Sequence, residues 1–582
     1  MPVNLRPTNS KPLYLIDAIG PFFRGLKRKT INWSKIPFDH LGIDDSTGTH
    51  QQWAQIQTDL EIFATKTTAL GFNAVSLDDV SHLADHPTYE TAVRSAIARY
   101  REEFRRCFAI LERHGLSVYL TMDYLSLPLG IKRERVEPLR FVRELLSQFL
   151  DDFPDVAGVI LRIGEADGHD VRGLFRSELH ITSATEANTL LKVLLPVFEA
   201  RQRRLIFRTW TVGAYPIGDL IWHRNTFARA LLGIDSPALI VSMKHGESDF
   251  FRFLPLNGNF FGTKLPKIIE FQTRREYEGC GEFPAFVGEE YRRLILQLQA
   301  AENVVGCMIW CQTGGWVPFR RLAFVDGTGI WAELNTAVVI AQFQAPELDL
   351  HSTVLAVARR LGCPNPESLW ELLQLSESAV RRLMYVEQAA QQKLFFRRVR
   401  LPTLFHVYWH NLFVNEAVRS LLRLLVQDRE ESLNAARDIM GSFGRMEELA
   451  RQCEMPENDI AFMEDTFQLL ALSRQYVFSD DTKALEQELR HAKRNYKEKY
   501  PKGGARHRYR IKLDFAPLRF HPRYLRWAVL VFFRRVRGYR VLDHLVTLRL
   551  LSYVYRLISR HRPEWVPEFA RKSAMGLETV FK

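Results

Sequence analysis

The sequence has no C-x-x-C cysteine pair and no long apolar segment, and each of these absences excludes a kind of protein or site. Its six cysteines are scattered through 582 residues without a C-x-x-C pair, which fits a reducing compartment and offers no zinc signature. The opening stretch, MPVNLRPTNSKPLYLIDAIG, contains no basic-then-apolar leader, so we expect no secretory signal. No apolar run approaches about 18 residues, which argues against a membrane-spanning helix. We therefore expect a cytoplasmic globular protein.

Positive charge is concentrated at one end of the chain. The net charge is +12, yet residues 491–582 alone carry +17, from 23 Lys and Arg against 6 Asp and Glu, which leaves −5 for the rest. A basic segment favours an acidic partner or surface. We expect an Arg-rich amphipathic helical pair there, packed on the rest of the chain or against another copy in a homo-oligomer. An anionic membrane surface and an acidic polysaccharide are the alternatives, and no recognition motif favours nucleic acid.

Short apolar segments alternate with amphipathic helical patterns over the first 345 residues. Eight strands alternating with helices predict a (β/α)8 barrel, a TIM barrel of the α/β class. A doubly wound sheet is not favoured, because no G-x-G-x-x-G follows the first strand. The expected strands lie within residues 13–20, 72–80, 117–124, 157–165, 204–210, 238–246, 266–272 and 304–312.

Long helical patterns replace the strands after about residue 345. We expect a (β/α)8 barrel at 1–345, an appended all-helical domain at 346–490 and a basic helical C-terminal extension at 491–582. Residues 500–510, YPKGGARHRYR, resemble an exposed basic linker.

Two pairs of metal-binding residue types have simpler interpretations. His406 and His410 lie four residues apart in an expected helix, but their surroundings, LFHVYWHNLF, are so apolar that we expect buried core histidines. Cys307 and Cys311 fall around the eighth strand and are expected to be buried thiols. The sequence therefore predicts no metal site and no cofactor.

The strongest chemical signal lies at the expected C-terminal ends of the strands, where barrel active sites lie. Paired carboxylates there suit glycoside hydrolysis, in which one acid protonates the leaving oxygen and another activates water or attacks carbon. Neighbouring cations would acidify carboxyl groups and hold an anionic sugar. The acids are Glu165, Asp249, Glu270 and Glu276, and the cations are Arg208 and Lys244.

Several of these motifs, in order over about residues 60–345, resemble the α-glucuronidases of glycoside hydrolase family 67. They include ALGFNAVSLDDV, RHGLSVYLTMDY, ILRIGEADG, RLIFRTW, LIVSMKHGESDFF and EFQTRREYEG. The last is the most specific, because it matches the family's Glu-Phe-Gln-x-x-x-Glu-Tyr-x-Gly. The family's N-terminal β-rich domain has no counterpart, and His245 replaces an asparagine. We therefore expect a divergent relative with a different substrate shape.

The resemblance implies a glycosidase that inverts the anomeric carbon and cleaves a uronic acid from a glycan. Glu165 would be the general acid, while Asp249 and Glu276 would activate water. The expected substrate-binding residues are Arg162, Arg208, Trp210, Lys244 and Tyr277.

Two alternatives remain open. A retaining barrel glycosidase would use Glu165 with Glu270 as nucleophile on another sugar; otherwise Glu270 would be a hydrogen-bonding support. Alternatively, the protein would be a non-catalytic glycan-binding or polysaccharide-assembly protein.

Overall fold

A computed structural model gives the structure of the chain, and it describes most of the residues up to 517. The described ranges are 11–24, 36–131, 136–164, 174–177, 180–211, 216–221, 223–314, 321–392 and 410–517, with short pieces between 395 and 408 and beyond 522.

The N-terminal region is a closed barrel of eight parallel strands, as the sequence predicts. Each of the eight expected segments contains one barrel strand. In barrel order the strands are β1 (Leu13–Asp17), β2 (Ala74–Leu77), β3 (Ser117–Asp123), β5 (Gly158–Arg162), β7 (Arg204–Arg208), β8 (Leu239–Lys244), β9 (Lys267–Gln272) and β10 (Val304–Trp310). The last strand pairs with the first through Leu13–Ile16 and Gly306–Ile309, which closes the ring.

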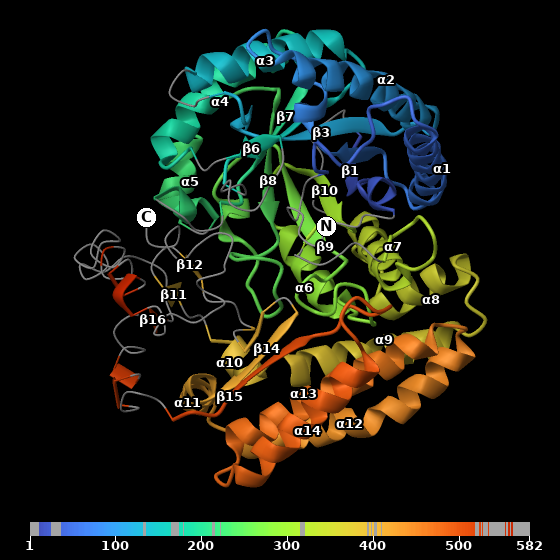
Figure 1. Cartoon of the computed structure of the whole chain (residues 1–582), viewed down its shortest axis with the longest axis vertical. Helices are drawn as coiled ribbons and strands as arrows, with labels where there is room; N and C mark the ends of the chain where they lie inside the picture. The colour runs from blue at the N-terminus through green and yellow to red at the C-terminus, as the bar shows by residue number, and fades with distance from the viewer. Residues whose placement is uncertain are drawn as a thin grey trace.

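Helices surround the barrel on its outer side (Figure 1). They are α1 (Thr47–Ala69), α2 (Thr91–Arg113), α3 (Pro138–Asp152), α4 (Ala184–Glu199), α5 (Arg224–Ala230), α6 (Gly288–Leu298) and α7 (Ile330–Gln344). Local sequence fixes several ends. Ser183 and Glu186 form a capping box that starts α4. Gly115, at φ +71°, follows α2 in the left-handed conformation that glycine adopts most easily.

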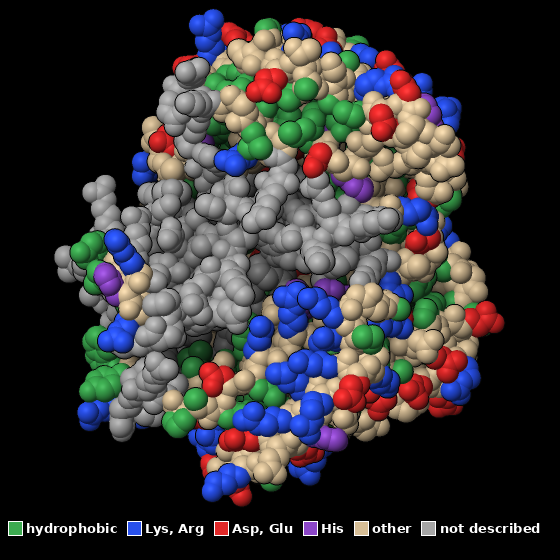
Figure 2. Space-filling view, in the orientation of Figure 1, with side chains coloured by type: hydrophobic (Ala, Val, Ile, Leu, Met, Phe, Trp, Pro, Cys, Tyr) green, Lys and Arg blue, Asp and Glu red, His purple; other side chains and the backbone are tan. Residues whose placement is uncertain are grey.

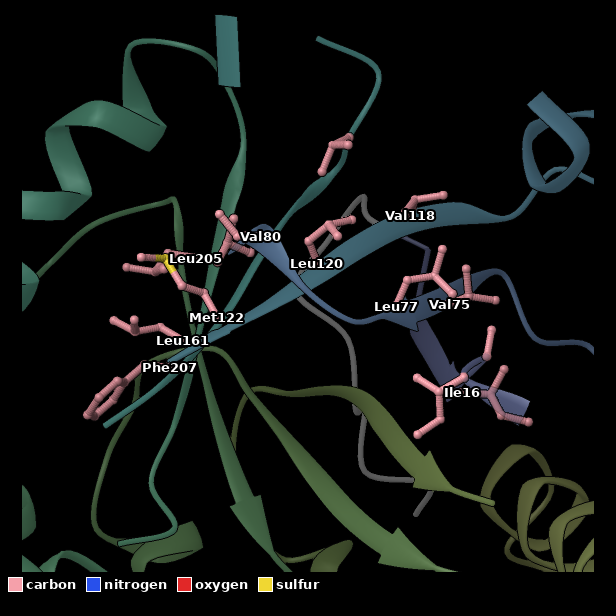
Figure 3. Close-up of a cluster of buried hydrophobic side chains, with 14 of the residues drawn as sticks. Ile16, Val75, Leu77, Val80, Val118, Leu120, Met122, Leu161, Leu205 and Phe207 are labelled. Atoms are coloured by element: carbon pink, nitrogen blue, oxygen red, sulfur yellow. The ribbon is translucent and has the colours of Figure 1, made fainter. Parts of the chain in front are cut away.

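Alternating side chains on the strands build two apolar layers. One side of the strands packs against the helices, and Figure 3 shows part of this layer, including Ile16, Leu77, Leu161 and Phe207. The other side fills the interior of the barrel with residues such as Ile206. This burial on both faces explains why the strand segments are predominantly apolar.

The region after the barrel is mostly helical and lies next to the barrel, in yellow to orange in Figure 1. Its helices are α8 (Leu350–Arg360), α9 (Pro366–Ala379), α10 (Glu387–Ala390), α11 (Glu416–Leu425), α12 (Arg429–Gln452), α13 (Glu457–Phe478) and α14 (Lys483–Lys499). Its apolar core is continuous with Phe251, Tyr277, Phe286 and Trp331 of the barrel region. α14 runs through the boundary expected at residue 490.

This region also contains strands, so it is not all-helical. One three-stranded sheet consists of β13 (Val407–Tyr408), β14 (Asn411–Asn415) and β15 (Arg510–Asp514), and another of β11 (Phe395–Phe396), β12 (Val399–Arg400) and β16 (Phe533–Arg534). A separate two-stranded sheet, of β4 (Ser126–Pro128) and β6 (Phe175–Ser177), lies in the barrel region.

Residues 403–427, expected as one long helix, form the β13–β14 hairpin followed by α11. The aromatic and β-branched residues there favour strands, and Asn415 caps α11 by accepting from Val418 N at 2.9 Å. His406 and His410 therefore do not share a helix face. Both are buried, as predicted, and burial lowers the pKa of His406 to about 3 and of His410 to about 4.

Three further expectations concern the cysteines, the basic C-terminal region and membrane-spanning helices. Cys307 and Cys311 are buried thiols, as predicted, and burial raises the pKa of both. The expected Arg-rich helical pair falls mostly outside the described residues. Of the helices that the structure describes, none combines the length and apolar character needed to cross a membrane.

Candidate active site

The inward-facing positions of the barrel change from apolar to polar toward the C-terminal ends of its strands. Residues two apart on a strand point to the same side. The apolar interior layer includes Leu15, Ala74, Tyr119, Ile160, Ile206, Ile240, Ile268 and Met308. Two residues further along, the same strands carry Asp17, Ser76, Thr121, Arg162, Arg208, Ser242, Glu270 and Trp310. Strand alternation thus places a polar layer at the end of the barrel where active sites lie.

Glu270 on β9 is held by residues from three other strands. Arg208 Nε lies 3.0 Å from Oε1 and 2.9 Å from Oε2, and its Nη2 lies 2.8 Å from Oε2. Ser242 Oγ donates to Oε1 at 2.7 Å and Trp310 Nε1 to Oε2 at 2.9 Å. Burial alone would raise the pKa of Glu270, but the charge and hydrogen bonds of Arg208 lower it overall. With 0% of its surface exposed, Glu270 has the surroundings of a supporting carboxylate.

Two of the expected sugar-binding cations already have carboxylate partners. Arg208 pairs with Glu270, and its guanidinium lies 4.6 Å from the centre of the Trp310 ring. Arg162 Nε lies 2.9 Å from Asp123 Oδ1, and both side chains are buried. These arginines balance negative charge within the barrel.

Asp249 lies in the segment after β8, beside Lys244 and Tyr277. Lys244 Nζ lies 2.5 Å from Asp249 Oδ1, Tyr277 OH donates to Oδ2 at 2.7 Å, and Phe250 N donates to Oδ1 at 2.9 Å. Burial opposes ionisation, but the charge and hydrogen bond of Lys244 lower the pKa of Asp249 overall. The side chain keeps 16% of its surface exposed, so Asp249 is an accessible, ionised carboxylate.

Glu276 lies in the segment after β9, and its pKa is shifted in the opposite direction to that of Asp249. Burial and the nearby charge of Asp249 raise its pKa to about 8. Gln272 makes two hydrogen bonds to Glu276. Gln272 Nε2 donates to Glu276 Oε1 at 3.0 Å, and Glu276 N donates to Gln272 Oε1 at 2.9 Å. At neutral pH the site therefore combines an ionised Asp249 with a protonated Glu276, and such separated pKa values mark acid–base pairs in enzymes.

Of the remaining expected residues of interest, Trp210 and His245 are among the described residues and Glu165 is not. Trp210 is half-buried, with Lys244 Nζ 3.6 Å from the centre of its ring. His245 is fully buried, and burial lowers its pKa to about 3. Glu165, the expected general acid, lies outside the described residues.

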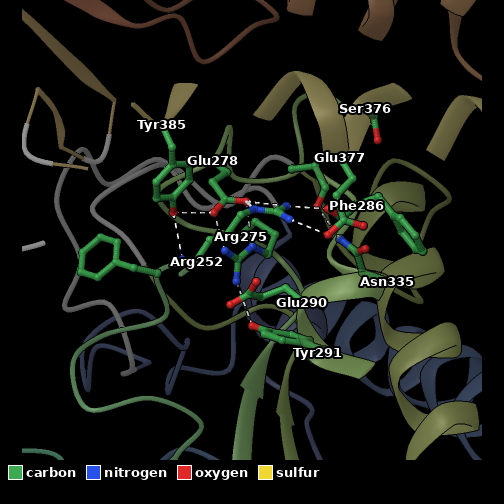
Figure 4. A network of polar contacts seen from close by, with 12 residues as sticks. Arg252, Arg275, Glu278, Phe286, Glu290, Tyr291, Asn335, Ser376, Glu377 and Tyr385 are labelled. Carbon is green, nitrogen blue, oxygen red and sulfur yellow. Dashed lines mark hydrogen bonds and ion pairs between the residues drawn. The ribbon is translucent and has the colours of Figure 1, made fainter. Parts of the chain in front are cut away.

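A buried polar network ties the loops that carry Asp249 and Glu276 to the helical region (Figure 4). Arg252 Nε donates to Glu278 at 3.1 Å and its Nη1 to Glu377 at 2.9 Å. Tyr385 OH donates to Glu278 at 2.8 Å and accepts from Arg252 N at 3.2 Å. Burial opposes ionisation of Glu278, but the charges of Arg252 and Arg275 lower its pKa to about 2.

Sequence reasoning missed the supporting residues Gln272 and Ser242. Gln272 belongs to the Glu-Phe-Gln motif, so the motif itself was a signal for its role. Ser242 had only its position near the end of a strand, which many structural residues share. No group of three or more His, Cys, Asp or Glu side chains within the described part of the chain is arranged to hold a metal ion.

Comparisons with known proteins identify a fold but no family. No protein-family model matches the chain, and no curated protein matches it. One solved structure, a GH138 enzyme targeting pectin rhamnogalacturonan II, aligns with a TM-score of 0.53 and 10% identity over 85% of this chain and 63% of that chain. Another, CpGH89 from Clostridium perfringens in complex with GlcNAc-α-1,4-galactose, aligns with a TM-score of 0.41 and 9% identity over 84% and 53% of the two chains.

The chain thus spans less than two thirds of the length of either structure. At this level of identity the first likeness shows a shared fold, in agreement with the closed barrel. The resemblance to family 67 stays a prediction.

Proposed function

We propose that the protein is a glycoside hydrolase that releases a uronic acid from a glycan or oligosaccharide with inversion. The observation that carries this proposal is the pair of carboxyl groups after β8 and β9: Lys244 and Tyr277 bond to Asp249, Gln272 bonds to Glu276, and the charge of Asp249 helps to raise the pKa of Glu276. Inverting glycoside hydrolysis needs an ionised carboxylate as base, the role proposed for Asp249, and a protonated acid at the leaving oxygen, the role proposed for Glu165. The shared barrel fold and the sequence motifs support the same chemistry.

In this mechanism Asp249 is the base that accepts a proton from water. The water oxygen forms a bond to the anomeric carbon as the glycosidic bond breaks, and Glu165 gives its proton to the leaving oxygen. The protonated Glu276 donates a hydrogen bond that holds the water beside Asp249. Lys244 and Tyr277 keep the Asp249 carboxylate ionised and oriented.

Selectivity for a uronic acid depends chiefly on Lys244. Arg208 and Arg162 are engaged with Glu270 and Asp123, so they act through their charge. Lys244 gives one N–H to Asp249, and an ammonium group has three. Its other donors would meet the sugar carboxylate, and Trp210, against which it lies, would cover the apolar face of the sugar ring. The named pectin target of the GH138 enzyme supports a plant-type polysaccharide as the source of such a sugar.

A turnover screen against glucuronate- and galacturonate-capped oligosaccharides tests this proposal. We expect release of the uronic acid, and proton NMR of the first product should show the inverted anomer. Asp249→Asn and Glu165→Gln should each lower kcat by about 10²–10⁴-fold. Glu371→Gln, an exposed carboxylate paired with Arg445, is the control and should leave kcat unchanged.

The alternatives give distinct results. A retained anomer would favour the mechanism with Glu165 and Glu270. Binding of uronosides by folded wild-type protein without turnover of any of them would favour the non-catalytic glycan-binding protein.

A further inference from the structure

A second charged feature lies on the helical region, away from the carboxyl pair. Residues 483–517 contain 11 Lys and Arg against 4 Asp and Glu. Figure 2 shows Lys and Arg side chains gathered over the part of the molecule where Figure 1 places α14 and β15. We define the α14–β15 basic surface by Arg490, Lys493, Arg494, Lys497, Arg510 and Lys512.

Local geometry brings these six side chains to one surface. Positions 490, 493, 494 and 497 follow the i, i+3, i+4, i+7 spacing of one helix face, and positions 510 and 512 share one side of a strand. β15 is held next to α14 because Tyr509 N donates to Tyr496 OH at 3.3 Å and Arg490 lies 4.9 Å from the centre of the Phe515 ring. The two elements therefore form one continuous cationic face.

The charges on this face have no carboxylate partner within the described part of the chain. None of the six makes an ion pair with any described residue, whereas the neighbouring Lys499 pairs with Asp465 and Arg506 with Asp459. Five of the six are exposed and Lys493 is half-buried. Besides burial, the charges of Lys497, Lys512 and Arg490 lower the pKa of Lys493, so the cations repel one another. A polyanion would relieve that repulsion.

We infer that the α14–β15 basic surface binds an anionic polysaccharide, such as a polyuronate, independently of the proposed barrel chemistry. The cations repeat about every 5 Å along the helix and about 7 Å along the strand, a spacing comparable with one carboxylate per sugar. Duplex DNA carries about one charge per 1.7 Å, a much denser array.

A membrane surface fits this face less well. Binding at a bilayer interface uses apolar side chains that enter the lipid. In residues 483–517 no large apolar side chain is exposed. The same feature argues against single-stranded nucleic acid, which stacks its bases on exposed aromatic rings.

Fluorescence anisotropy with a labelled polygalacturonate oligomer tests this inference on the full chain. Wild type should bind at 50 mM salt and more weakly at 200 mM. The quadruple variant Lys493→Gln, Lys497→Gln, Arg510→Gln and Lys512→Gln should raise Kd by about tenfold or more. The double variant Lys493→Gln and Lys497→Gln changes fewer residues and so disturbs folding less. Its Kd should rise by a smaller factor.

A matched control removes the same charge from exposed positions elsewhere. Arg143→Gln, Lys192→Gln, Arg229→Gln and Arg360→Gln together should change Kd by less than about twofold. An equal loss in this control, or unchanged binding in the quadruple and double variants, overturns the inference. So does tighter binding of duplex DNA or phosphatidylserine vesicles than of polygalacturonate.

One further variant distinguishes binding at the α14–β15 basic surface from binding at the barrel site. Asp249→Asn should retain polygalacturonate binding even if it abolishes turnover. Loss of binding in Asp249→Asn would place the polymer at the barrel and overturn the assignment to α14 and β15.

Discussion

Replacing Glu276 with glutamine should stabilise the protein at alkaline pH. Glu276 is 5% exposed, and burial and the charge of Asp249 raise its pKa to about 8. A glutamine at this position would keep an oxygen for the hydrogen bond from Gln272 and would never ionise. A residue proposed to act in catalysis thus lowers the stability of the folded state, a common feature of active sites.

The size of the effect follows from the pKa. Below about pH 4.5, the ordinary pKa of the group, Glu276 is protonated in both the folded and the unfolded chain. Its ionisation then leaves the free energy of unfolding unchanged. As the pH rises to about 8, the unfolded chain releases the proton while the folded protein keeps it, so stability falls by about 1.4 kcal/mol per pH unit. The full difference is about 5 kcal/mol, and Glu276→Gln removes it.

Scanning calorimetry of wild type and variant between pH 5 and pH 8.5 measures this difference. For a chain of this length, 5 kcal/mol corresponds to about 4 °C in Tm if it unfolds as one unit. We expect the Tm of the variant to exceed that of wild type by less than about 1 °C at pH 5 and by about 4 °C at pH 8.5.

Two controls isolate the cause. Glu371→Gln removes an exposed carboxylate whose pKa is lowered by Arg445, so its effect should not grow between pH 5 and pH 8.5. In an Asp249→Asn background the gain from Glu276→Gln should shrink, because the charge of Asp249 is then absent. A Tm difference that stays constant with pH would refute the assignment of a raised pKa to Glu276.

Two further predictions concern neighbouring charges. Glu278→Gln should lower the free energy of unfolding by about 3 kcal/mol at pH 7, because the pKa of Glu278 is about 2 instead of its ordinary 4.5. Wild type should lose this advantage as the pH falls from about 4.5 toward 2, and equal urea midpoints for the two proteins at pH 7 would contradict the network. Lys244→Met should raise the pKa of Asp249 by removing the charge that lowers it, so the acidic limb of the kcat/KM profile should move to higher pH. If the acidic limb of the kcat/KM profile does not move, Lys244 does not set the pKa of the proposed base.

The barrel was predictable because its signal is local and repeated. Each strand is a short apolar run that ends in polar residues, and the β/α alternation leaves few ways to arrange eight of them. Asp249 and Glu276 stand 27 positions apart, yet they follow β8 and β9, which are neighbours in the barrel. Strand order alone therefore brought the two acids to the same region.

The partners of the charged residues were not predictable, because they depend on which side chains reach across the barrel. Arg208 on β7 passes β8 to meet Glu270 on β9, and no periodicity in the sequence encodes that contact. The β13–β14 hairpin was missed for a related reason. Its apolar residues fit a helix pattern as well as a strand, and β14 is stabilised by β15, almost a hundred residues away.

The helical region supports the catalytic face that we propose. Tyr277, which donates to Asp249, packs on Phe251 with ring centres 4.3 Å apart, and both belong to the apolar core that extends into the helices. In the next residues, Arg252 and Glu278 bond to Tyr385 of that region. Without the helices, Arg252 and Glu278 would lose buried partners, and breaking such contacts costs several kcal/mol. The geometry that holds Asp249 thus depends on both parts of the chain, which explains why motifs confined to the barrel could name the acids but not their environment.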